Sequence, residues 1–268
     1  MPTEQDAPHD TSGPVAHVRL FGGLTVERAD GTAVPTSAWR TGKTMDLLRL
    51  LALENGEPVR ADVLTGTLWP NAPRPRALGS LRTAASEIRR VIGTNCVERQ
   101  HDGLVLTDVW VDVPEFVALS QQVANAARHD RCQEVVGSAT AAEALYVGDF
   151  RAYDDDGLWA VAQRESLRRT RGEVLTEAAT CALHLGLHRE ARYLGRTAIS
   201  ILPTSEAAHR ALMAADAELG EIAGALETFE VFRRRLAEEL GADPSVQTRE
   251  LHVRLLRGSD PGEGLSAG

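Results

Sequence analysis

Arginine side chains are concentrated in one short segment of the chain. Between residues 74 and 90, five arginines stand against a single acid, Glu87. They are Arg74, Arg76, Arg82, Arg89 and Arg90. Guanidinium groups bind the phosphates of nucleic acids, and they pair with guanine through two parallel hydrogen bonds. The segment therefore predicts a DNA-binding surface, with a merely solvated helix face as the alternative.

The spacing of apolar residues places these arginines on a helix. Apolar side chains recur every three or four residues from Leu78 to Ile92, so a helix over residues 76–93 buries one face. The side chains predicted to read base edges from the opposite face are Arg82, Thr83, Ser86 and Glu87. Those predicted to hold the DNA backbone are Lys43, Arg74, Arg76, Ser80, Arg89, Arg90, Arg99 and His101. Glu87 accepts from cytosine but also repels phosphate, so its effect is either altered specificity or weaker binding.

The chain shows no pattern typical of an enzyme. The run Thr41-Gly-Lys-Thr44 resembles the end of a phosphate-binding loop, but the glycine required five residues before Gly42 is Ser37. No nucleophile stands beside a base and no metal-ligand spacing occurs, so we expect neither catalysis nor a cofactor or metal. The odd number of cysteines and their wide separation favour reduced, partly buried thiols in a reducing cytosol. They are Cys96, Cys132 and Cys181.

The elements around the arginine-rich helix follow the order of a winged helix-turn-helix. Two strands flank a Gly-Gly break within residues 17–27, and residues 32–34 form a short return strand. Helices are expected at about 44–53, 60–69 and 76–93, and a hairpin joins residues 96–99 to 104–106. We therefore predict an α+β winged helix-turn-helix over residues 15–112.

The second half of the chain carries an internal repeat of 34 residues. Gly186 and Gly220 are separated by this interval, and so are Ala191 and Ala225. It is the period of tetratricopeptide repeats, in which small residues let the two helices of a pair approach closely. Residues 113–146 form a less regular unit, a helix follows at 158–183, and another at 246–256 closes the array. The prediction is an all-α tetratricopeptide-like domain over residues 113–258.

Both halves resemble one family. The motifs are Trp39-Arg-x-x-Lys43, Leu68-Trp69-Pro70 and Leu81-Arg82-Thr83-x-x-Ser86 in the first half, and Tyr146-x-Gly-Asp149-Phe150, His209-Arg-Ala-Leu-Met213 and Glu238-Glu-Leu-Gly-Ala-Asp-Pro-Ser245 in the second. Over residues 17–257 the chain is similar to the Streptomyces antibiotic regulatory proteins. These join a response-regulator-type winged helix to a bacterial transcriptional activation domain. Where that family usually has a basic residue, this chain has Glu87.

The resemblance implies a sequence-specific transcription activator of a secondary-metabolite gene cluster. Its helix over residues 76–92 enters the major groove of double-stranded promoter DNA and its wing reaches the minor groove. Such proteins bind direct repeats as head-to-tail homodimers and recruit RNA polymerase. Glu87 and the acidic net charge leave an alternative open. In it, the chain is an interaction protein that holds another regulator through its helical repeats, with weak or no base-specific DNA binding.

The distribution of charge is compatible with DNA binding despite the net charge of −9. Residues 15–115 carry 12 basic and 12 acidic side chains, whereas residues 116–268 are acidic. No run of apolar residues is long enough to span a membrane, and no signal peptide is evident, so we expect a cytoplasmic protein. Residues 1–14 and 259–268 are expected to be disordered tails.

Two charge runs in the second half have open interpretations. Asp154-Asp155-Asp156 either faces an arginine of a partner or starts the next helix, where acids favour the helix dipole. Arg233-Arg234-Arg235 is either a solvated helix face or a contact to polymerase or DNA.

Overall fold

The computed structural model describes residues 13–153 and 157–258, and it divides the chain into two compact units. The first contains the chain up to Pro114 together with Phe150–Val161, and the second contains Glu115–Asp149 and the chain from Ala162 onward. The first unit has strands and three helices, and the second is entirely helical in its described residues. The predicted fold class, a winged helix followed by helical repeats, is confirmed.

The first unit begins with a three-stranded sheet in the order β2-β1-β6. Its strands are β1 (Ala16–Arg19), β2 (Thr25–Arg28) and β6 (Val109–Val111). β1 pairs antiparallel with β2 and parallel with β6. The sequence did not predict β6, because its three residues lie next to the expected boundary between the domains and are too few to show an alternation.

A buried carboxylate fixes the end of this sheet. Asp112 follows β6 directly, and its Oδ1 and Oδ2 accept from the Leu20 amide at 2.8 and 3.0 Å. The Phe21 amide donates to Oδ2 at 3.1 Å. Burial raises the pKa of Asp112, although the bonds from these amides oppose the shift. The residue that starts the next helix therefore also anchors the chain leaving β1.

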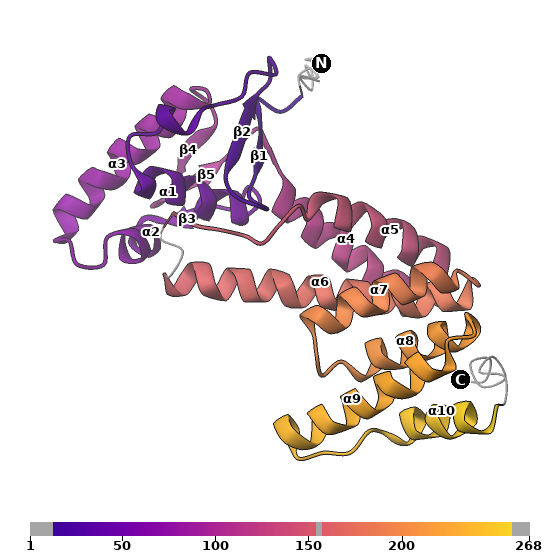
Figure 1. The fold of residues 1–268 in the computed structure, drawn as a ribbon. Coiled ribbons are helices and arrows are strands. Elements are labelled where there is room, and N and C mark those ends of the chain that lie inside the picture. The colour runs from indigo at the N-terminus through magenta and orange to yellow at the C-terminus, as the bar shows by residue number, and fades with distance from the viewer. Residues whose placement is uncertain (1–12, 154–156, 259–268) are drawn as a thin grey trace, which may run out of the picture. The chain divides into compact units, whose positions relative to one another are not determined.

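Three helices and a hairpin complete the winged helix (Figure 1). The elements are α1 (Gly42–Leu53), β3 (Val59–Arg60), α2 (Ala61–Leu68), α3 (Arg74–Val91), β4 (Val97–Gln100) and β5 (Gly103–Leu106). A short 3-10 turn, Thr36–Ala38, precedes α1. All three helices were predicted to within two residues, and the hairpin in the order β3-β5-β4 forms the wing. The side chains that close the core between the helices are Leu47, Leu48, Leu51, Leu64, Leu68, Leu81 and Ile88.

A segment from far along the chain belongs to the first unit. We call Phe150–Val161 the strap; its described residues are 150–153 and 157–161, so Asp154-Asp155-Asp156, whose role was left open, lies outside the described residues. Phe150 is fully buried and forms an antiparallel bridge with Phe21. Its ring meets the Trp159 ring edge-on, with 6.0 Å between the centroids. The winged helix is thus completed by residues that follow the first two helices of the other unit.

The strap also reaches the start of α1. The Tyr153 amide donates to Asp46 Oδ1 at 2.8 Å, and Arg49 Nη1 donates to the same oxygen at 3.1 Å. The Tyr153 ring lies directly on Gly42, where an added Cβ would stand 2.0 Å from ring carbon Cδ1. Only a residue without a side chain admits the ring at this position.

The second unit is an array of helices. Its helices are α4 (Asp112–Ala127), α5 (Cys132–Leu145), α6 (Leu158–His184), α7 (His188–Ile201), α8 (Glu206–Glu218), α9 (Ile222–Leu240) and α10 (Val246–Arg257), of which α4 and α6 each begin in the first unit. Figure 1 shows α7 to α10 packed one after another. The predicted closing helix is α10.

The 34-residue repeat is visible in the backbone. Gly186 and Gly220 follow α6 and α8 with φ of 73° and 81°, a left-handed conformation that favours glycine. Ala191 and Ala225 are fully buried at the start of α7 and α9, where a larger side chain would hold the helices apart. The repeat predicted from the sequence therefore has the expected steric basis.

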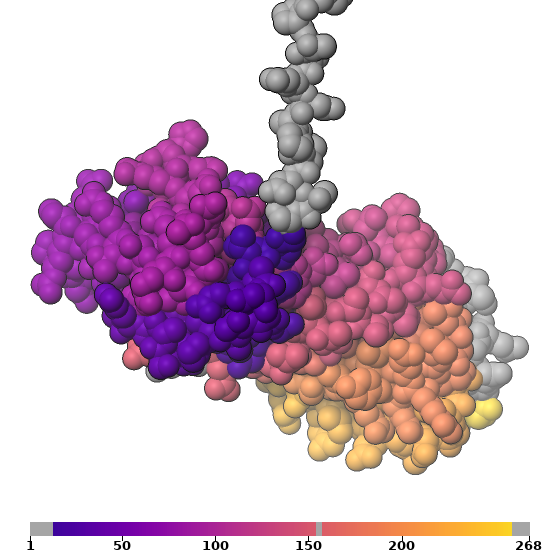
Figure 2. Space-filling model, turned by 90° about the horizontal axis from the view of Figure 1, so that it is seen from above, coloured from indigo at the N-terminus to yellow at the C-terminus, as the bar shows by residue number. Residues whose placement is uncertain are grey.

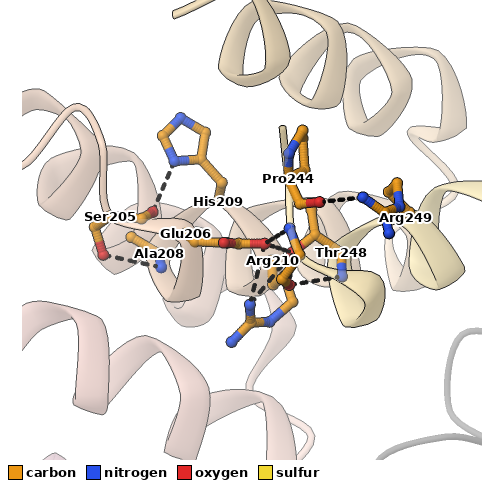
Figure 3. A network of polar contacts seen from close by, with 9 residues as sticks. Ser205, Glu206, Ala208, His209, Arg210, Pro244, Thr248 and Arg249 are labelled. Atoms are coloured by element: carbon orange, nitrogen blue, oxygen red, sulfur yellow. Dashed lines mark hydrogen bonds and ion pairs between the residues drawn. The ribbon is translucent and has the colours of Figure 1, made fainter. Parts of the chain in front are cut away.

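One carboxylate joins the starts of α8 and α10 (Figure 3). Glu206 Oε1 accepts from the Ser245 amide at 2.7 Å and from the Thr248 hydroxyl, and Arg210 Nη1 lies 3.7 Å away. Burial alone would raise the pKa of Glu206, but the hydrogen bonds from Ser245 and Thr248 outweigh it, and the pKa is lowered. The contact fixes the closing helix, whose Leu251 and Leu255 cover the core around Phe229.

We predict that Gly42→Ala destabilises the protein by about 1–3 kcal/mol, because the methyl group displaces the Tyr153 ring. In a Tyr153→Ala background the same change should cost nothing. Urea unfolding of the four proteins measures the coupling. Gly137→Ala in α5 is the control, since a Cβ there meets no atom within 4 Å and should be neutral or stabilising. Equal costs in both backgrounds would show that the ring does not oppose the methyl group.

We predict that Glu206→Gln lowers the free energy of unfolding by about 1–3 kcal/mol at neutral pH, because charge-assisted bonds to Ser245 and Thr248 are lost. The folded-state pKa lies below the ordinary glutamate value of 4.5, so this contribution is present above pH 4.5 and is lost as the pH falls below it. Unfolding at several pH values should show the two proteins converging in acid. Glu218→Gln, an exposed site on the same helix, should show no such difference.

Candidate nucleic-acid interface

The exposed face of α3 carries three of the four side chains predicted to read bases. Arg82, Thr83 and Ser86 are exposed, and helical spacing puts them on one side of the helix. The Thr83 hydroxyl donates to the Gly79 carbonyl at 3.1 Å, which leaves its methyl group outward. In the space-filling view, the purple-to-magenta part of the first unit, which includes α3, lies at the surface (Figure 2).

Gly79 lies in the middle of this face and was not singled out from the sequence. A Cβ built there meets no heavy atom within 4 Å, so the fold of the unit does not require a glycine. A mid-helix glycine costs about 0.5–1 kcal/mol relative to alanine. Its effect is to leave the helix backbone uncovered at this point of the face. The only available signal was a glycine inside an otherwise regular helical pattern.

The arginines predicted to hold phosphates lie at both ends of α3. Arg74 and Arg76 are exposed in its first turn, and Ser80 is half-buried one turn later. At the other end, Arg90 is exposed and its Nη2 donates to the Ala38 carbonyl at 3.0 Å. Arg89 is half-buried, and its Nε donates to the Val97 carbonyl on the wing at 2.7 Å. Both C-terminal arginines thus have structural partners as well as a charge.

A groove separates α3 from the wing. It has a volume of about 220 Å³, and Arg82, Arg89, Arg99 and Asp102 contribute to its walls. The structure thus brings together three predicted DNA contacts that lie on two elements. Asp102 is an acid among these arginines, and the sequence did not identify it as part of the site.

The tip of the wing is a tight turn. Gln100 pairs with Gly103, and His101 between them has a φ of 52°. Arg99 and His101 are exposed there, as a contact to the DNA backbone requires. Arg60, at the start of α2, lies 3.7 Å from the Asp102 carboxylate and so joins the wing to that helix.

The prediction that Glu87 reads bases needs correction. The side chain is buried, its Oε1 accepts from the Arg40 amide, and its Oε2 accepts from the Thr44 hydroxyl at 3.2 Å. Both oxygens face the start of α1, and none is presented to a base. Helical spacing from Ser86 carries position 87 from the exposed face to the side that packs on α1. Glu87 is thus a positioning residue for α3.

Lys43 lies on another element than the arginines of α3. It is half-buried in the first turn of α1, where the Thr41 hydroxyl caps the helix by accepting from the Thr44 amide at 3.2 Å. The run that resembled a phosphate-binding loop is therefore an ordinary capped helix start. Lys43 belongs to the segment that Glu87 holds in place.

Two of the three arginines in the run on α9 pair with acids of their own helix. Arg233 pairs with Glu230 at 2.9 Å and Arg235 with Glu239 at 3.3 Å, both along α9 itself. Within residues 13–153 and 157–258, no three His, Cys, Asp or Glu side chains are arranged to hold a metal. No helix in these residues is long and apolar enough to cross a bilayer.

The chain matches known proteins over both units. It is 29% identical to the regulatory protein AfsR of Streptomyces griseus over 244 residues, which cover 84% of this chain and 24% of AfsR. It is 27% identical to the regulatory protein DnrI of Streptomyces peucetius over 259 residues, which cover 91% of this chain and 93% of DnrI. The chain thus spans about a quarter of AfsR and nearly all of DnrI.

A solved structure confirms the fold. Mycobacterium tuberculosis EmbR, in complex with a low-affinity phosphopeptide, aligns with a TM-score of 0.77 and 23% identity. The alignment covers 92% of this chain and 66% of that one.

Residues 111–256 match the family described as the bacterial transcriptional activator domain. That match covers more than half of the chain, and the proteins similar to it are transcriptional regulators. The chain belongs to the bacterial transcriptional activator domain family and, with its winged helix, to the Streptomyces antibiotic regulatory proteins.

Proposed function

We propose that this transcriptional regulator is a sequence-specific DNA-binding activator that inserts α3 into the major groove and the wing into the minor groove. The observation that carries the proposal is the exposed face of α3, where Arg82, Thr83 and Ser86 are flanked by arginines at both helix ends. A B-DNA major groove admits one α-helix, and its base edges present hydrogen-bonding groups to outward side chains.

The residues divide into two roles. Arg82, Thr83 and Ser86 contact base edges, and an arginine bonded to guanine supplies about 1–3 kcal/mol of discrimination. The exposed and terminal basic side chains contact phosphates, which fixes the register of the helix without reading sequence. They are Arg74, Arg76, Arg89, Arg90, Arg99 and His101, with Ser80 and Lys43 as further backbone contacts.

The burial of Glu87 removes one objection to DNA binding. A carboxylate on the outer face of α3 would repel phosphates, but both of its oxygens are bonded to the start of α1. Residues 15–115 carry as many basic as acidic side chains, so the excess of acids lies in the rest of the chain. The charge of the chain therefore does not favour the alternative, an interaction protein without base recognition.

The helical unit supplies the activating contact in this proposal. The chain binds direct repeats as a head-to-tail homodimer, and α4 to α10 present a surface to RNA polymerase. Support comes from the match of this unit to an activator domain and from the similarity of nearly the whole chain to DnrI. The gene cluster under control encodes a secondary metabolite, as the family implies.

The first experiment selects genomic fragments with the purified full chain and footprints the DNA that is recovered. We expect direct repeats whose half-sites lie about one or two helical turns apart, each roughly 10.5 base pairs. Transcription in vitro from a recovered promoter should then rise when the protein is added to RNA polymerase. Recovery of no preferred sequence would overturn base recognition and favour the interaction protein.

We predict that Arg82→Ala weakens binding to the selected site by about 1–3 kcal/mol while leaving random DNA nearly unaffected. Arg74→Ala should weaken binding to both DNAs alike and reduce the salt dependence by about one charge. Titrations of labelled duplexes at several salt concentrations measure both effects. Arg189→Ala, an exposed arginine on α7, is the control and should change neither. Equal losses on both DNAs with Arg82→Ala would exclude it from base reading.

We predict that Glu87→Gln lowers the free energy of unfolding by about 1–2 kcal/mol, because a buried charge-assisted acceptor is replaced by a neutral amide. The preference of the folded variant among bases should stay unchanged. Urea unfolding and a binding-site selection with the variant measure the two effects. Glu98→Gln on the wing is an exposed control. A changed base at one position of the selected site would restore Glu87 to the reading face.

A further inference from the structure

Two of the three cysteines meet at one end of the helical unit. Cys132 is the first residue of α5, and Cys181 lies in the last turn of α6. They are far apart in the sequence, but the fold brings them close enough for an interaction with Cys132 to raise the pKa of Cys181. Cys132 is half-buried and Cys181 is buried, so solvent reaches the pair from the Cys132 side.

A histidine completes the group. His184 is exposed one turn after Cys181, and its Nδ1 lies 3.7 Å from Cys132 Sγ. In the tautomer whose Nδ1 carries no proton, this ring nitrogen accepts a hydrogen bond from the Cys132 thiol. The three residues therefore form one group, in which the exposed histidine lies beside the more accessible thiol.

The two thiols have different environments. Burial, the bond to Cys132 and the charges of Glu177 and Asp130 raise the pKa of Cys181 to about 12, so this thiol stays protonated. Cys132 has the histidine and the access to solvent, so it reacts first. Cys181 then lies close to the oxidised sulfur of Cys132.

We propose that Cys132, Cys181 and His184 form a redox-modification site that a hydroperoxide converts to an intrachain disulfide. This inference does not depend on the DNA-binding proposal. A metal site is the other use of such residues, but these three are not arranged to hold one.

The chemistry has two steps. His184 takes the Cys132 proton, the thiolate attacks a peroxide oxygen, and an S–O bond forms as the O–O bond breaks; the leaving alkoxide takes a proton and departs as an alcohol. The Cys181 sulfur then attacks the Cys132 sulfenic acid. An S–S bond forms, the S–O bond breaks, and hydroxide leaves as water with the Cys181 proton. The two thiols are oxidised together by two electrons and one hydroperoxide is reduced. Exchange with a thiol reverses the change.

The disulfide would tie the start of α5 to the end of α6 and close the chain between them. Cross-linking residues so far apart in sequence restricts the unfolded chain and stabilises the fold. The oxidised helical unit would be held covalently at this end, while the reduced unit is held by packing and by non-covalent contacts such as the Arg171–Glu143 ion pair.

The test treats the reduced full chain with hydrogen peroxide, blocks remaining thiols with an alkylating reagent, and maps the digested protein by mass spectrometry. We expect a peptide linked through Cys132 and Cys181 that dithiothreitol separates. Cys96 is the internal control, because it lies fully buried in the first unit, where burial raises its pKa to about 11, and it should remain a thiol. Stepwise oxidation of Cys132 with Cys181 still a thiol, disulfides between chains, or no reaction of either would overturn the proposal.

A second measurement tests the role of His184. His184→Ala should slow the loss of the Cys132 thiol at least about tenfold, since a positioned base is removed. His129→Ala is the matched control, an exposed histidine that follows α4 and whose Nδ1 hydrogen-bonds with the Asn125 carbonyl. It should leave the rate unchanged. An unchanged rate with His184→Ala, in a variant whose circular dichroism matches that of the native chain, would exclude the histidine from the site.

Discussion

A carboxylate removed from water must find hydrogen-bond donors, and the position of α3 depends on one such group. Glu87 finds its donors in the Arg40 amide and the Thr44 hydroxyl, which lie on either side of the start of α1. The angle at which α3 faces outward is thereby tied to the beginning of another helix. The strap contacts the start of α1 as well, because the Tyr153 ring lies on Gly42 and the Tyr153 amide donates to Asp46. A continuous set of contacts thus runs from the strap through α1 to the helix that carries the proposed base contacts.

Buried acids recur at the places where the first unit changes direction. Asp112 holds the chain that leaves β1, Asp46 holds the strap, and Glu87 holds the turn into α1. Each accepts at least one backbone amide, which satisfies a donor that regular secondary structure leaves unpaired. The result is a small domain whose non-repetitive segments are fixed by specific bonds as well as by its leucine core.

The repetitive parts of the fold were predictable because they leave periodic signals. The leucines of α1 and the apolar stripe of α3 have helical spacing, and Gly186 and Gly220 mark a 34-residue repeat that backbone sterics require. The arginines of the proposed interface were predictable because five of them are concentrated in residues 74–90. Three features could not be predicted, because each depends on a partner far away in the sequence. They are the parallel strand β6, the strap and the burial of Glu87. Ser86 and Glu87 are neighbours in the sequence, yet Ser86 is exposed on the outer face of α3 and Glu87 is buried on the inner one. Helical spacing alone does not show which residues at the border of the apolar face are buried.

The discontinuous make-up of the first unit sets an order of events during protein synthesis. The sheet, three helices and wing have all been synthesised by about residue 114, yet the unit lacks the strap until residue 161 has followed. During that interval Phe21 has no Phe150 beside it, and the Asp46 carboxylate has no amide from Tyr153. α4 and α5 are made in the meantime, so part of the activator domain is present before the winged helix can close. A fragment cut at the apparent domain boundary would reproduce that unfinished intermediate.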